Sequence, residues 1–185
     1  MYYRLLEFYK RDVYFVYSED KNSIDWTEFR KGKEINIDIP LLYEVDKIDN
    51  YISDYDILPV IGAPLVSKKF KEVFKECIGT EMVFLQSIII DKKGNKNEEF
   101  LVLNILNKIS CMDTEKSITE KTKYGTTKIK KLFFTPNSLV NKSIVRMEEH
   151  NSYIIVTEEF KKRCEEAGLK GVEFIEEGHS IYTDI

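Results

Sequence analysis

Few residues in this chain could do chemistry near neutral pH. His150 and His179 are the only histidines, so they alone could serve there as a general base or an imidazole metal ligand. Both lie in polar stretches rich in Glu, which predicts surface histidines. Cys111 is followed by Asp113 at the end of a predicted strand, a place where functional loops often begin. An enzyme would have to bring Cys111, Asp113 and a histidine together, and the spacing of these residues in the sequence does not predict that they meet.

The three cysteines give no sign of a disulfide framework or a zinc site. Cys77, Cys111 and Cys164 are odd in number and far apart, which favours buried, reduced thiols. Cys77 and Cys164 also fall on the apolar stripes of two predicted helices, with no activating neighbour. We therefore predict no catalytic residue, no cofactor and no metal, and we expect a reducing compartment, the cytoplasm.

Acidic side chains are concentrated in the last third of the sequence. From Glu148 onward they recur more often than basic ones, and Glu148, Glu149, Glu158 and Glu159 form two vicinal pairs. Glu158 and Glu159 also suit the first turn of a helix, where negative charge is favourable. One interpretation is a solvated surface, and the other is an acidic face that steers a positively charged partner. We take these four residues as candidate partner-binding residues.

Composition limits the classes of partner. A chain of 185 residues with a net charge of −4 has a surface poorly suited to neutralising phosphates, so we expect no nucleic-acid partner. The longest nearly uncharged run, residues 57–66, contains two prolines and is about half the length of a membrane span. We therefore expect no membrane association. The composition leaves the oligomeric state open.

The predicted elements indicate an α+β fold with mainly antiparallel sheets. Residues 1–50 read as a strand-rich N-terminal part of the same body, with strands near 13–17 and 36–40 and no strong helix signal. Residues 51–185 read as an α+β core, so that the chain forms a single compact domain. Short amphipathic helices are predicted at about 68–78 and 158–167, packed on the sheets. Predicted strands at 82–90 and 100–109 form a hairpin, as do those at 144–147 and 153–156, and another strand covers 129–134.

Two segments of the sequence match each other without a gap. Residues 65–85 align with 155–175 at an offset of ninety, which pairs Ser67 with Thr157 and Phe70 with Phe160. Each copy reads as strand, hydroxyl N-cap, short helix, glycine turn and strand. A true internal duplication and two independent units of a common type both explain the match. Either interpretation predicts that Phe70 and Phe160 are buried against a sheet.

The order of several short motifs resembles immunity protein family 11 of bacterial polymorphic toxin systems, a family long catalogued as a domain of unknown function. The resemblance covers about residues 51–175. Its motifs are Tyr55-Asp56-Ile57-Leu58-Pro59, Pro64-Leu65-Val66-Ser67-Lys68-Lys69-Phe70-Lys71, Leu103-Asn104-Ile105 leading to Cys111-Met112-Asp113, Ile155-Val156-Thr157-Glu158-Glu159-Phe160-Lys161 and Ala167-Gly168-Leu169-Lys170-Gly171-Val172.

This resemblance implies a bacterial cytoplasmic protein that binds and neutralises a cognate toxin, for example a nuclease, by protein–protein interaction. It transfers no catalytic residue, and the Cys-x-x-Cys-Gly pairs of a related metal-binding group are missing from this sequence. Two other functions stay open at this stage. One is a small enzyme acting on a nucleotide or a toxin product through Cys111, Asp113 and a histidine, and the other is a stand-alone regulatory binding module.

Overall fold

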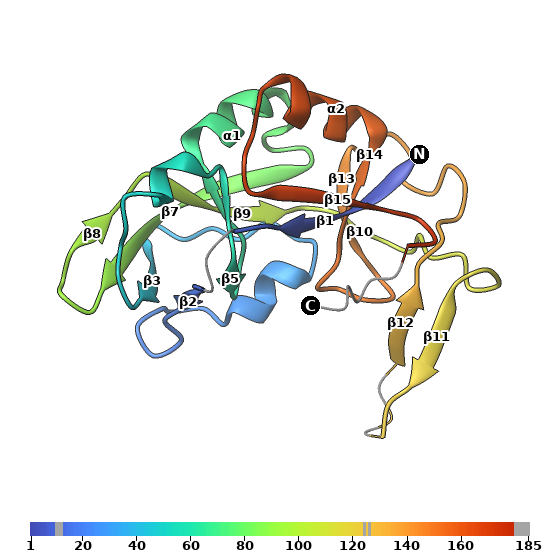
Figure 1. The fold of residues 1–185 in the computed structure, drawn as a ribbon, viewed down its shortest axis with the longest axis horizontal. Helices are drawn as coiled ribbons and strands as arrows, with labels where there is room; N and C mark the ends of the chain where they lie inside the picture. The colour runs from blue at the N-terminus through green and yellow to red at the C-terminus, as the bar shows by residue number, and fades with distance from the viewer. Residues whose placement is uncertain (10–12, 124, 126, 180–185) are drawn as a thin grey trace.

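The computed structural model describes residues 1–9, 13–123, 125 and 127–179, and it shows an α+β protein (Figure 1). The strands are β1 (Tyr2–Glu7), β2 (Phe15–Tyr17), β3 (Leu41–Val45), β4 (Ile57–Leu58), β5 (Val60–Ile61), β6 (Leu65–Ser67), β7 (Met82–Asp91), β8 (Lys96–Asn97), β9 (Phe100–Ile105), β10 (Lys108–Ile109), β11 (Ile118–Lys121), β12 (Thr127–Lys131), β13 (Ile144–Met147), β14 (Ile154–Thr157) and β15 (Val172–Glu176). The α-helices are α1 (Lys68–Val73) and α2 (Glu158–Glu166), and three 3-10 turns are η1 (Trp26–Arg30), η2 (Ile52–Asp54) and η3 (Lys75–Cys77).

Most strand pairs are antiparallel, as predicted, and three pairs are parallel: β2 with β5, β3 with β7, and β10 with β13. The largest sheet has the order β4-β6-β9-β7-β3-β2-β5, with β8 paired to β7. A second sheet has the order β10-β13-β14-β1-β15, and β11 with β12 forms a small third sheet. The strands of residues 1–50 are therefore built into both larger sheets.

Several elements of the structure differ from those predicted. The expected strand at 36–40 does not form, and β3 instead starts after Pro40, whose missing N–H cannot join a ladder. The first helix was predicted to reach residue 78 but ends at Val73, and the turn η3 follows it. No strand was predicted at residues 118–121, where the structure has β11, and the following strand, β12, covers 127–131 rather than 129–134.

The four strands β4-β6-β9-β7 and the four strands β13-β14-β1-β15 repeat one arrangement. In each, a strand, an α-helix and a second strand follow one another along the chain, with an antiparallel strand between the two. The pairing register is also the same. Val102 pairs with both Leu65 and Leu85, and Arg4 pairs in the same way with Ile155 and Ile175. The aligned segments of the sequence therefore occupy equivalent places in two structural repeats.

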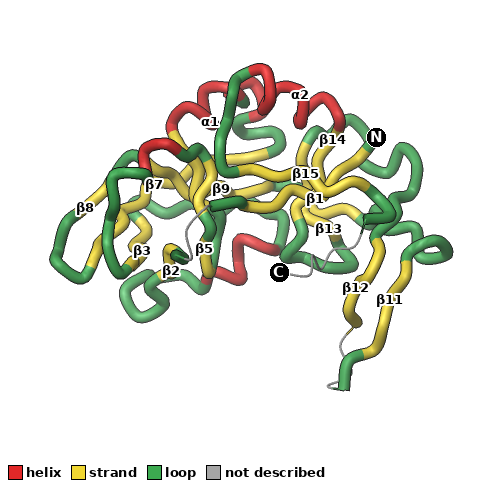
Figure 2. Tube along the Cα trace, viewed as in Figure 1, coloured by secondary structure: helices red, strands yellow, loops and turns green. Residues whose placement is uncertain are grey.

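The two α-helices lie side by side on one side of the strands (Figure 2). Ser67 and Thr157 cap them, each accepting a hydrogen bond from the amide three residues on. Phe70 and Phe160 are fully buried, which confirms the prediction, and their rings lie 6.2 Å apart. Phe160 also stacks on Phe74 with ring centroids 4.2 Å apart. Aromatic packing between the repeats is therefore the centre of the largest hydrophobic cluster.

Within the described part of the chain, no helix is both long and apolar enough to cross a membrane.

Candidate partner-binding site

Cys111 and Asp113, two residues of the enzyme hypothesis, have different local environments. The Cys111 thiol is buried, and burial, reinforced by the Glu149 carboxylate, raises its pKa to about 12, so it is protonated at neutral pH. The Asp113 carboxylate accepts hydrogen bonds from the Lys116 and Glu115 amides. These bonds lower the pKa of Asp113, and the bond from the Lys116 amide has the largest effect. Asp113 therefore has a structural role in a turn.

The histidines have different environments. His179 is exposed, as predicted, and lies 3.9 Å from a Glu176 oxygen. His150 was predicted to be a surface residue but is half-buried, because its ring stacks on Tyr153 with centroids 4.0 Å apart. Burial lowers the pKa of His150, and the nearby Arg4 guanidinium adds to that effect. Among the residues that the structure describes, no three His, Cys, Asp or Glu side chains form a metal-binding group.

The four acidic candidates lie at opposite ends of the β13–β14 hairpin. Glu148 and Glu149 follow β13, whereas Glu158 and Glu159 follow β14, and these two strands are antiparallel. Glu149 has an internal role, because its carboxylate accepts hydrogen bonds from the Ser110 hydroxyl (2.6 Å) and the Met112 amide (3.1 Å). Glu148 is exposed and lies 3.9 Å from the Lys108 ammonium. The structure therefore separates the two pairs.

Glu158 and Glu159 line a cleft of about 500 Å³, which we call the α2 cleft. Its walls are the start of α2, the turn η3, residues 139–143 and the first residues of the chain. Both glutamates are exposed, and Glu158 accepts a hydrogen bond from the Tyr3 hydroxyl, the main reason that the pKa of Tyr3 rises to about 12. The lining residues are Met1, Tyr2, Glu76, Cys77, Glu81, Leu139, Val140, Asn141, Lys142, Ser143, Thr157, Glu158, Glu159, Phe160 and Arg163.

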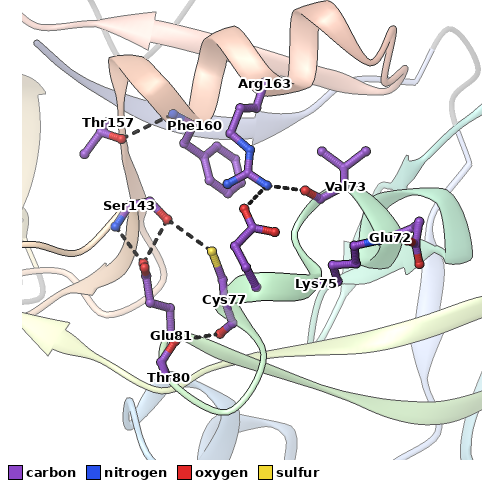
Figure 3. A network of polar contacts seen from close by, with 11 residues as sticks. Glu72, Val73, Lys75, Cys77, Thr80, Glu81, Ser143, Thr157, Phe160 and Arg163 are labelled. Atoms are coloured by element: carbon purple, nitrogen blue, oxygen red, sulfur yellow. Dashed lines mark hydrogen bonds and ion pairs between the residues drawn. The ribbon is translucent and has the colours of Figure 1, made fainter.

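A polar network joins the two repeats along this cleft (Figure 3). The Glu81 carboxylate accepts hydrogen bonds from the Ser143 amide (2.6 Å), the Ser143 hydroxyl (2.8 Å) and the Ile144 amide (3.2 Å). Arg163 of α2 donates to the Val73 carbonyl and forms an ion pair with Glu76. These contacts tie the two walls of the cleft together.

The rim of the α2 cleft has an unusual backbone. Asn137, Val140 and Asn141 all have positive φ, of 57°, 28° and 61°. Asn tolerates the left-handed region, but a β-branched residue there is an outlier that the surrounding structure has to hold. The Val140 side chain is also 70% exposed. The cleft thus combines acidic side chains with one exposed apolar side chain.

Sequence reasoning found only part of this site. It singled out Glu158 and Glu159 but not Val140, Glu81 or Arg163. A valine with positive φ has no signature in the sequence, and Glu81 and Arg163 resemble ordinary charged residues of a turn and a helix. The roles of Glu81 and Arg163 depend on contacts between the two repeats.

The described residues thus include an acidic cleft with an exposed apolar side chain, a feature that fits a protein that acts by binding. The comparison with protein families agrees with this class. The model of the immunity protein family Imm11 matches residues 20–179, and the chain belongs to that family. A comparison with curated proteins gave no match.

Proposed function

We propose that this protein is an immunity protein that binds a cognate bacterial toxin in the cytoplasm and neutralises it by covering its active site, without catalysis. Membership of the immunity protein family over residues 20–179 is the observation that carries this proposal. The protonated, buried Cys111 supports a non-catalytic role, because a thiol of raised pKa is a poor nucleophile.

We further propose that the α2 cleft contacts the toxin. Glu158 and Glu159 are exposed at its mouth, next to the exposed Val140 side chain. Acidic groups around an apolar contact favour a cationic partner, such as a nuclease whose active site binds phosphates. Glu148 and Glu149 are weaker candidates, because the Glu149 carboxylate already binds residues 110–112.

The first test is rescue. The chain is co-expressed with the toxin encoded beside it, and cell survival and co-purification are measured. We expect survival and a one-to-one complex. If the cells die although the protein is folded and abundant, the proposed function is wrong.

The second test concerns the cleft. The double variant Glu158→Gln/Glu159→Gln should associate with the toxin about tenfold more slowly, because attraction between opposite charges sets much of the association rate. Glutamine keeps an oxygen that can accept the Tyr3 hydrogen bond, so folding should persist. The control is Glu98→Gln/Glu99→Gln, an exposed vicinal pair elsewhere with the same change in charge. Equal rates for both variants would remove the α2 cleft from the interface.

A further inference from the structure

The hairpin of β11 and β12, here called the arm, projects away from the rest of the protein (Figure 1). It forms its own two-stranded sheet and pairs with neither of the larger sheets. All four residues of β11 are exposed. A two-stranded hairpin is only marginally stable alone in water, so its presentation on the surface has to be supported by the body.

Support comes from the base of the arm and from one buried side chain. Ile129 of β12 is buried in the hydrophobic cluster that also contains Phe134. At the base, the Asp113 amide donates to the Phe133 carbonyl (2.9 Å), and the Ser117 hydroxyl accepts from the Phe133 amide (2.9 Å). The arm is therefore held at its base and at Ile129, whereas all of β11 faces solvent.

The charge of the arm is opposite to that of the body. Residues 114–131 contain six lysines and two glutamates, a balance of +4 in a chain whose net charge is −4, so the remaining residues carry −8. The lysines are Lys116, Lys121, Lys123, Lys128, Lys130 and Lys131. Ile118, in the same segment, is 50% exposed and offers an apolar contact among them.

The arm and the α2 cleft are linked by the intervening segment. Residues 135–143 run from the end of the arm to the rim of the cleft, and the Leu139 amide donates to the Tyr2 hydroxyl (3.4 Å). The ring of Tyr2 packs edge-on against Phe134 at 5.9 Å. Tyr2, which lines the cleft, thus contacts Leu139 within this segment and Phe134 just before it.

We propose that the arm is a second contact for the toxin and binds an acidic patch on its surface. This inference rests on the proposed function. A protein partner can present both charge signs, and so can match a basic arm and an acidic cleft together. A nucleic acid is disfavoured, because it would be repelled by the −8 of the remaining residues.

The experiment compares two variants with the same loss of charge. Lys121→Gln/Lys123→Gln/Lys131→Gln alters exposed positions on the arm. Lys92→Gln/Lys93→Gln/Lys96→Gln alters exposed positions near β8, far from the arm in Figure 1. Association rates with the purified domain of the toxin encoded beside this chain are measured at low and high salt. A short DNA duplex and an RNA strand serve as polyanion probes, and thermal unfolding checks that each variant is folded.

We expect the arm variant to associate about tenfold more slowly than the wild type at low salt, with a smaller salt dependence, and the β8 variant to stay within about twofold. If the wild type and the arm variant bind the toxin at the same rate, the arm inference is wrong and the proposed function stands. In that case the lysines only protect the edges of the hairpin from pairing with other chains. Arm-dependent binding to DNA or RNA with no effect on toxin binding would also overturn it. If the folded wild type does not bind the toxin at all, both proposals fail.

Discussion

The two structural repeats share their strand order and pairing register but differ in what surrounds them. In the first repeat the central strand is β9, whose six residues are all buried. In the second it is β1, where only Tyr3 and Leu5 are buried. The other face of β9 packs on the hydrophobic cluster of β2 and β3, whereas the second repeat meets the smaller cluster at the base of the arm. The first repeat is thus the more enclosed, and the proposed binding features lie beside the second.

The starts of the helices show the same difference in charge. α1 begins with Lys68 and Lys69, and α2 begins with Glu158 and Glu159. Negative charge stabilises a helix start and positive charge opposes it. Lys69 compensates by donating to the Gly168 carbonyl at 3.0 Å, which ties α1 to the second repeat. The start of α1 therefore connects the two repeats, whereas the start of α2 faces the α2 cleft.

The largest predicted effect tests the contact between the repeats. Phe160→Ala should lower the free energy of unfolding by about 3–5 kcal/mol, because it leaves a cavity between fully buried rings. Urea unfolding followed by circular dichroism measures this loss. Phe8→Ala, at a phenylalanine that is 46% exposed, is the control and should cost about 1 kcal/mol or less. A similar loss in both variants would mean that the repeats do not depend on this packing.

The prediction of intermediate size concerns Glu81, because one repeat uses a backbone carbonyl as the acceptor where the other uses this side chain. In the second repeat the Lys170 carbonyl accepts from the Asp56 amide (2.8 Å), and in the first the Glu81 carboxylate takes the equivalent place opposite Ser143. Glu81→Ala should cost about 1–3 kcal/mol of stability, because it leaves polar groups near Ser143 without their acceptor. Glu72→Ala, at an exposed ion pair with Lys75, should cost about 0.5 kcal/mol or less in the same urea titration. Equal losses would show that Glu81 is an ordinary surface residue.

The smallest effect compares the two N-caps. Thr157→Ala should destabilise the protein by about 1 kcal/mol, since the Phe160 amide loses its acceptor. Ser67→Ala should cost more, because the Ser67 hydroxyl also donates to the Asp56 carboxylate at 2.6 Å. Thermal unfolding of both variants, with Thr157→Ser as the conservative control, checks the order. A larger loss at Thr157 would contradict the environments described for the two caps.

Much of the local structure was predictable from the sequence because it depends on near neighbours. The helix starts at Ser67 and Thr157 follow from hydroxyl caps before apolar periodicity, and the β13–β14 hairpin follows from two short apolar strands around a polar turn. β11 was missed because all of its residues are exposed, so the strand has no apolar face to signal it.

Long-range features could not be predicted from the sequence in the same way. β1 pairs with β14 and β15, and nothing in residues 2–7 indicates a partner at the other end of the chain. The candidate site has the same difficulty. Glu158 and Glu159 stood out by composition, but the cleft beside them also includes Val140 and Asn141, which lie in the centre of a turn closed by the Lys142 amide and the Leu139 carbonyl.

The position of β1 has a consequence for biosynthesis. Tyr3 is translated more than 150 residues before its strand partners Val156 and Glu176. At about 5–20 residues per second, this apolar strand waits many seconds before its sheet can close. Contacts so distant along the chain also slow spontaneous folding. The sheet of β1, β14 and β15 can therefore close only after β15 has been synthesised, so β1 has to stay unpaired until then.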